Sequence, residues 1–143
     1  YKPKVLVGSP YHGSWWVPGG NSYLANIITD AGGEYLGKSN LSHESYIISF
    51  ENALIWGNEA DIWINMGNML SKREIAGSDK RLSAFKVFQE GKIFNNINRL
   101  SRHGGNDFWE SGTVNPHLIL NDLIIAFHPE LLNGKMNYYK EIR

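Results

Sequence analysis

The chain has 143 residues, enough for one domain with its own core, and its 14 basic residues balance its 14 acidic residues. This balance leaves no basic stripe, which argues against nucleic acid or an anionic membrane surface as a partner. The lack of cysteine excludes a disulfide, a thiolate metal site and a cysteine nucleophile, and no apolar run is long enough to cross a bilayer. Because the chain opens at Tyr1, without a methionine, we expect a processed chain or a fragment.

The first predicted unit is a strand that leads into a helix. Residues 5–7 are apolar and predict a buried strand. The residues up to Ala31 predict an amphipathic helix, with Asn21 or Ser22 as its cap and its end at Gly32 and Gly33. A strand followed by a helix is the first half of a parallel α/β unit. Ligands of such sheets bind at the carboxyl ends of the strands. The apolar helix positions share one face at spacings of three and four residues: Leu24, Ile27, Ile28 and Ala31.

A long glycine-containing loop is predicted between this strand and this helix. It carries Tyr11, His12, Trp15 and Trp16. Two adjacent tryptophans in such a loop do not both point inward, so at least one is expected to face solvent or a partner. The alternative is that both belong to the core.

The rest of the chain repeats the strand and helix alternation. Helices are predicted over residues 50–56, capped by Ser49, over 80–89 and over 118–127, where Asn115 caps and Pro116 is the first helical residue. Strands are predicted over residues 34–36, 60–66 and 92–95, with polar segments at 37–44, 70–79, 96–114 and 131–143. This order predicts a single α/β domain over residues 1–143, a three-layer α/β/α sandwich with a mainly parallel sheet.

Motifs of enzymes and metal sites are weak in this sequence. Residues 19–22, Gly-Gly-Asn-Ser, resemble a phosphate-binding turn but match no nucleotide fingerprint. The five histidines show no paired ligand spacing on one helix, and His128, before Pro129, is a helix-end residue. Asp107 and Glu110 form a close carboxylate pair, for which a solvated or capping role is the simpler interpretation. We therefore predict no enzyme activity, no resident cofactor and no metal site.

Five segments, taken in order, resemble one family of proteins. They are KPKVLVG, GGNSYLANIITDAGGEYLG, SFENALIWGNEADIWI, FKVFQEGKIFNN and GGNDFWESGTVNPHLILNDLIIAFHPEL. Together they resemble the C-terminal lobe of a class III substrate-binding protein, from ABC importers of iron–siderophore complexes, haem and cobalamin. The last segment is similar to the form found in Bacteroidetes, except that His117 stands where aspartate is usual, and Phe85 replaces the usual alanine of the fourth segment. The resemblance extends over almost all of residues 2–132.

The resemblance implies a two-lobed parent protein that holds a metal complex in the cleft between its lobes and presents it to ABC permease subunits. This chain is then the C-terminal ligand-binding lobe, located in the periplasm, free or lipid-anchored. Trp15 and Trp16 are expected to stack on a flat ligand, and residues 106–109, with Asn106 and Trp109, to form a second cleft wall. Glu51 resembles the lobe-top glutamate that pairs with permease arginines, although the helix dipole alone explains an acidic residue there.

The identity of the ligand stays open in the sequence. An anionic ferric siderophore would require cleft arginines, for which Arg99 and Arg102 are candidates, although a solvated loop explains both residues at least as well. Haem requires an axial ligand such as Tyr11 or His12. Two other classes of function also stay open. One is an enzyme or metallochaperone on the same scaffold, and the other is a protein-interaction domain that uses the tryptophan loop.

Overall fold

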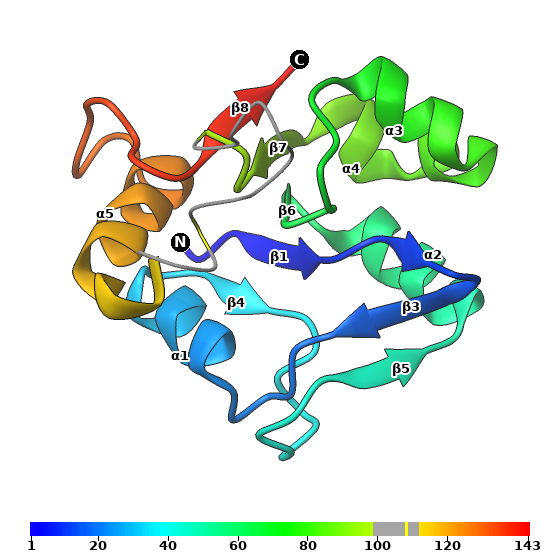
Figure 1. Ribbon diagram of the computed structural model, residues 1–143, viewed down its shortest axis with the longest axis horizontal. Coiled ribbons are helices and arrows are strands. Elements are labelled where there is room, and N and C mark those ends of the chain that lie inside the picture. Colours follow the sequence, from blue (N-terminus) through cyan, green and yellow to red (C-terminus); the bar gives the residue numbers. More distant parts are fainter. Residues whose placement is uncertain (99–107, 109–111) are drawn as a thin grey trace.

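A five-stranded sheet forms the centre of the molecule. The computed structural model describes residues 1–98, 108 and 112–143, and Figure 1 shows their arrangement. The strand order is β4-β1-β6-β7-β8; the first four strands are parallel and β8 is antiparallel to β7. The strand bounds are β1 Lys4–Val7, β4 Glu34–Tyr35, β6 Ile62–Ile64, β7 Lys92–Asn95 and β8 Lys140–Ile142.

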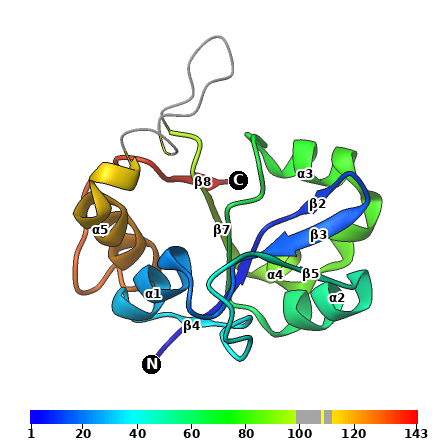
Figure 2. The same ribbon diagram turned by 60° about the horizontal axis from the view of Figure 1, so that its bottom comes forward.

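Helices cover both faces of this sheet, which confirms the three-layer α/β/α prediction (Figure 2). Helices α1 (Tyr23–Asp30) and α5 (Pro116–Phe127) pack on one face, and α2 (Phe50–Glu59), α3 (Lys72–Ser78) and α4 (Lys86–Glu90) on the other. Successive residues of a strand serve opposite faces. Because both faces are covered, consecutive residues of the central strands are buried: residues 5–7 in β1, 62–64 in β6 and 93–95 in β7.

The prediction of a loop between the first strand and the first helix is wrong in one respect, because this segment contains a β-hairpin. Strands β2 (Pro10–Tyr11) and β3 (Ser14–Val17) pair antiparallel, and β5 (Tyr46–Ile48) adds to β3 as the third strand of a small sheet. His12 and Gly13 form the two-residue turn, both with positive φ (50° and 81°), as hairpins of this length favour. Along β3, Trp15 and Val17 are buried and Trp16 is exposed, which is the alternation of a strand with one covered face.

Other boundaries differ from the prediction for identifiable reasons. Helix α2 continues past Trp56 to Glu59, because Gly57 lies against the Phe85 ring and is part of the helix rather than its end. The polar segment 70–79 contains α3, and the window 80–89 is divided into a 3₁₀ helix, η1 (Lys80–Ala84), and α4. A second 3₁₀ helix, η2, spans Gly112–Val114.

The caps follow the prediction at two helices and depart from it at a third. Ser22 caps α1 and Ser49 caps α2, each through its side-chain oxygen. Asn115 precedes α5, but its side chain makes no capping hydrogen bond; its carbonyl accepts from the Leu118 N–H instead, and Pro116 opens the helix.

The C-terminal segment, for which only a polar composition was noted, contributes to the core. Tyr138 and Tyr139 are each 1% exposed. The carboxylate of Asp122, on α5, is fully buried and accepts three backbone N–H groups, those of Asn137 (2.8 Å), Tyr138 (2.6 Å) and Tyr139 (3.1 Å). These bonds fix the chain where it enters β8, because a buried carboxylate is stable only when it is hydrogen-bonded.

Candidate functional site

Two tryptophans fix the carboxyl end of the first strand. The Trp15 Nε1–H donates to the carbonyl of Val7 (3.1 Å), and the Trp63 Nε1–H donates to the carbonyl of Gly8 (2.8 Å). Gly8 has φ +99°, and a Cβ there would lie 2.7 Å from the Trp16 carbonyl oxygen. The backbone at this end of the sheet is therefore rigid and requires glycine.

A hollow of about 180 Å³ opens beside this fixed strand end. It lies over the carboxyl ends of β1, β6 and β7, the edge at which ligands of parallel sheets bind. We name it the carboxyl-end hollow. Its lining comes from β1, β3, α1 and the loops after β6 and β7, and consists of Val7, Gly8, Trp16, Val17, Pro18, Leu24, Ser45, Asn65, Gly67, Asn68 and Asn96.

Asn65 follows β6 directly and has a left-handed backbone, with φ 57°. Asparagine tolerates this conformation better than most residues, and such strain is often retained at functional positions. The Tyr139 hydroxyl donates to the Asn65 Oδ1 (2.7 Å), and burial raises the pKa of Tyr139, so that this hydroxyl stays protonated. Within the described part of the chain, the Asn65 Nδ2 has no hydrogen-bond acceptor.

Asn95, the last residue of β7, holds in place the loop that follows β6. Its buried amide accepts from the Met66 N–H (3.1 Å) and donates to the carbonyls of Gly67 (2.7 Å) and Met69 (2.8 Å). The loop that carries Asn68 is thus ordered before any ligand arrives. Our sequence analysis missed these asparagines; the signal available was an asparagine at the carboxyl end of two predicted parallel strands.

The two adjacent tryptophans face opposite ways, which confirms the prediction that at least one of them points outward. Trp16 is 47% exposed and lines the hollow, whereas Trp15 is 2% exposed. The Trp15 ring packs near those of Phe50, Trp63 and Phe85, with centroids 5.9–6.4 Å away. This burial argues against the direct ligand contact predicted for Trp15 and gives it a supporting role.

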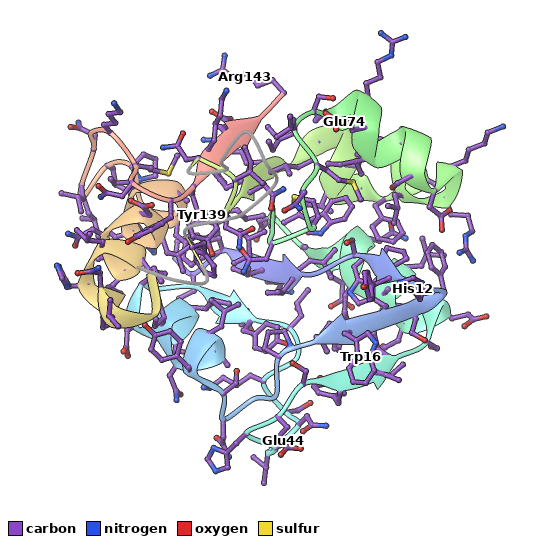
Figure 3. All side chains as sticks on the ribbon, in the orientation of Figure 1. His12, Trp16, Glu44, Glu74, Tyr139 and Arg143 are labelled. Atoms are coloured by element: carbon purple, nitrogen blue, oxygen red, sulfur yellow. The ribbon has the colours of Figure 1, made fainter. Side chains whose placement is uncertain are left out.

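Tyr11 and His12 lie at the tip of the β2–β3 hairpin, apart from the carboxyl-end hollow. Figure 3 shows His12 at this tip and Trp16 farther back along β3. The Tyr11 ring, 67% exposed as a residue, contacts the His12 ring edge-on at 4.2 Å between centroids. His12 borders a different hollow of about 400 Å³, with Ser49 and Arg81 among its other walls. The structure therefore does not bring Tyr11 and His12 into one hollow with Trp16.

Glu51 is exposed in the first turn of α2, and its charge acts on Arg81. The Arg81 guanidinium lies 3.7 Å from the Phe50 ring centroid and pairs with Asp79 at 2.8 Å. The hydrogen bond from Arg81 holds the pKa of Asp79 below its usual range, and Asp79, with a smaller effect of Glu51, raises the pKa of Arg81. The docking role predicted for Glu51 stays a prediction.

The turn of residues 19–22 is not an anion site. The Gly20 N–H donates to the Asn40 carbonyl (2.7 Å), and the Asn21 N–H donates to the Ser42 carbonyl (3.0 Å). The amides that would hold a phosphate are already paired, and the Cβ positions of Gly19 and Gly20 face backbone carbonyl oxygens that would repel an anion.

A third hollow, of about 480 Å³, lies at the opposite, amino end of the sheet. Its walls mix charges of both signs, among them Asp61, Lys92 and Glu130. It contains none of the predicted site residues, and parallel sheets bind ligands at the other end.

Several predicted residues lie outside the described part of the chain: Arg99, Arg102, Asn106 and Trp109, as well as Asp107 and Glu110. Among the residues that the structure does describe, no group of three or more histidine and acidic side chains is arranged to hold a metal ion. The helices of that part are also too short or too polar to cross a membrane. His128 ends α5 as predicted, with its Nε2 2.9 Å from the Gly32 carbonyl.

Two solved structures of binding proteins share this fold, each over about half of its own length. The chain superposes on an ABC transporter substrate-binding protein from Listeria monocytogenes EGD-e with a TM-score of 0.63 and 17% identity, over 90% of this chain and 48% of that one. It also matches the TroA-like periplasmic binding protein FepB from Veillonella parvula, with a TM-score of 0.65 and 13% identity, over 100% of this chain and 49% of that one.

The sequence also resembles one curated protein. The uncharacterized lipoprotein MJ0878 of Methanocaldococcus jannaschii is 25% identical over 140 residues, which cover 96% of this chain and 32% of the lipoprotein. No protein-family model matches the chain. The chain thus spans about one third of this relative and about half of each solved structure.

Proposed function

We propose that this chain is a ligand-binding lobe of the substrate-binding component of an ABC importer, and that it holds its ligand at the carboxyl-end hollow. The observation that carries the proposal is the exposed face of Trp16 beside a preordered polar loop, at the sheet edge where this fold binds ligands. A flat apolar group would stack on the indole, and the asparagine amides would orient it. Such a protein binds and releases its ligand without chemical conversion, so we propose no catalytic residue.

The size of the hollow supports a cleft with two walls. Ligand pockets usually measure about 300–1,000 Å³ and enclose most of the ligand, whereas this hollow measures about 180 Å³ and is open. The solved structures with this fold are about twice as long as this chain. We therefore propose that a second lobe closes over the ligand, and that the ligand is an iron–siderophore complex, haem or cobalamin.

The likeness to a lipoprotein supports a location outside the cytoplasmic membrane, in the periplasm or held by a lipid anchor. There the protein would deliver its ligand to permease subunits, with Glu51 at the contact. Replacing Glu51 by arginine in the complete protein should reduce uptake and leave ligand affinity unchanged. Glu59→Arg, an exposed glutamate at the other end of α2, is the matched control. Equal uptake by the Glu51 variant and the wild type would remove Glu51 from the docking contact.

The proposal is tested by tryptophan fluorescence. The complete gene product is titrated with ferric siderophores, haem and cyanocobalamin, and the 143-residue chain is titrated in parallel. We expect saturable quenching that weakens at least about tenfold in Trp16→Ala and is weaker in the single lobe. Ile55→Ala, exposed on α2 and outside the hollow, is the control. If no ligand alters the fluorescence of the complete protein, the importer proposal fails.

A protein-interaction domain is the second candidate function, and one observation favours it. The strand register puts Tyr11, Trp16 and Ile47 on the same outer face of the small sheet, and each is about half or more exposed. An exposed aromatic face of this kind is typical of protein contacts. The two functions are distinguished by the titration above, since a pure interaction domain binds none of the small molecules.

A further inference from the structure

Asn65 connects the carboxyl-end hollow to the buried C-terminal segment of the chain. It follows β6, lines the hollow, and accepts a hydrogen bond at its Oδ1 from the Tyr139 hydroxyl (2.7 Å). Tyr139 is 1% exposed, so the Oδ1 of Asn65 faces the core. The carboxamide is planar and its two polar atoms point in different directions, one an acceptor and the other a donor. The bond to Tyr139 therefore turns the Nδ2 donor of Asn65 toward the hollow.

The Tyr139 hydroxyl that orients Asn65 is itself held by the core. The buried Asp122 carboxylate on α5 accepts the Tyr139 N–H at 3.1 Å, and the Phe108 ring meets the Tyr139 ring edge-on, with centroids 5.8 Å apart. The backbone of Asn65 has φ 57°, a conformation that asparagine adopts more readily than most residues. The donor is thus placed before a ligand arrives, which lowers the entropy lost on binding.

From this arrangement we infer that Asn65 determines specificity by donating its Nδ2–H to an oxygen of the ligand, and that Tyr139 is its positioning residue. The inference rests on the proposed function and names the ligand group that the site recognises: an oxygen acceptor beside the flat face that stacks on Trp16, which lines the same hollow. This acceptor is a hydroxamate oxygen in a trihydroxamate siderophore, a carboxylate oxygen in haem and an amide carbonyl oxygen in cobalamin.

The first test reverses the donor of Asn65 in the complete gene product. Asn65→Asp keeps the size of the side chain and an oxygen for the Tyr139 hydroxyl, and aspartate also tolerates a positive φ, but an oxygen replaces the Nδ2 donor. Asn68→Asp is the matched control, because it adds the same charge to another residue of the same hollow. With a ferric trihydroxamate, haem or cyanocobalamin, whichever binds the wild type, Asn65→Asp should raise the Kd at least about tenfold more than Asn68→Asp does.

The second test asks whether Tyr139 acts through Asn65, by a double-mutant cycle on the Kd. Tyr139→Phe should raise the Kd about three- to tenfold in the wild type, and less than about twofold when Asn65→Gly has already removed the amide. Glycine is used there because it accepts the positive φ without strain. Tyr46→Phe is the control, since the Tyr46 hydroxyl donates to the Gly37 carbonyl (3.1 Å) and Tyr46 is not among the residues that line the hollow. It should leave the Kd unchanged.

The outcomes separate this inference from the proposed function. If a probe binds the wild type but Asn65→Asp binds it as well as Asn68→Asp does, or more tightly, the donor role of Asn65 is overturned and the importer proposal stays intact. An equal effect of Tyr139→Phe with and without the Asn65 amide overturns the positioning role of Tyr139. Failure of all three probes to bind the wild type overturns the proposed function, and this inference with it.

Discussion

Truncation of the two adjacent tryptophans should have opposite consequences for stability and for binding. Trp15 and Trp16 are neighbours on β3, yet one is 2% exposed and the other 47%. We predict that Trp15→Ala mainly destabilises the fold, whereas Trp16→Ala mainly removes ligand affinity. The comparison is well controlled, because the residue type, the strand and the substitution are the same.

The expected magnitudes follow from the contacts. Trp15→Ala removes a buried ring that packs near three aromatic rings, and it removes the donor to the Val7 carbonyl. Replacing a buried tryptophan by alanine typically destabilises a protein by about 3–5 kcal/mol. Trp16 keeps about half of its surface in water, so its truncation should destabilise the fold by about 1–2 kcal/mol.

The assay is urea denaturation of both variants, monitored by circular dichroism so that the lost fluorophore does not matter. With an m-value of about 2 kcal/mol/M, a difference of about 2 kcal/mol separates the two midpoints by about 1 M urea. Trp15→Phe should fall between wild type and Trp15→Ala, because it keeps an aromatic ring and loses the N–H donor. Equal midpoints for Trp15→Ala and Trp16→Ala would refute the alternation of inward and outward residues on β3.

Three further predictions concern the supports of the site. Tyr139→Phe should destabilise the fold by about 1 kcal/mol and weaken binding several-fold, because Asn65 loses its fixed orientation; unchanged affinity would show that this bond is not needed. Gly57→Ala should lower the free energy of unfolding by about 1–3 kcal/mol despite the better helix propensity of alanine, since a Cβ there overlaps the Phe85 ring; a more stable variant would contradict this packing. Burial raises the pKa of Tyr35 and Tyr139 above the ordinary value of 10.0, so their contribution is complete below about pH 10 and is lost as pH rises above it. Stability measured against pH should therefore fall in that range, and less steeply in Tyr35→Phe.

The strands and helices around the centre of the sheet could be predicted, because residues within or next to each element indicate it. Residues 92–95, Lys-Ile-Phe-Asn, follow the turn at Gly91, and they form β7 with the predicted bounds. Ser22 before α1 and Pro116 at the start of α5 are local signals of helix starts, and both were read correctly. Each of these elements buries its apolar face in the way that its own sequence period predicts.

The C-terminal strand could not be predicted from its own residues. Lys140–Ile142 is too short and polar for a strand signal, and its placement depends on Asp122, more than a dozen residues earlier. The same holds for Asn65, whose partner Tyr139 is 74 residues away. Contacts of this kind are specified by tertiary packing, which a local pattern does not reveal.

The candidate site combines these two kinds of information. Trp16 could be selected from the sequence, since an adjacent pair of tryptophans predicts one outward ring. Asn65 and Asn68 could not be selected, because they become site residues only through their position at the edge of the sheet. Tyr139 orients the Asn65 side chain, and Asn95 holds the loop that carries Asn68. Because the ring that supports β1 and the ring that lines the hollow are consecutive residues, a shift of β3 by one residue would exchange them. The Trp15 bond to Val7 opposes that shift, so the residue that looked like a binding residue in the sequence instead fixes the register that exposes Trp16.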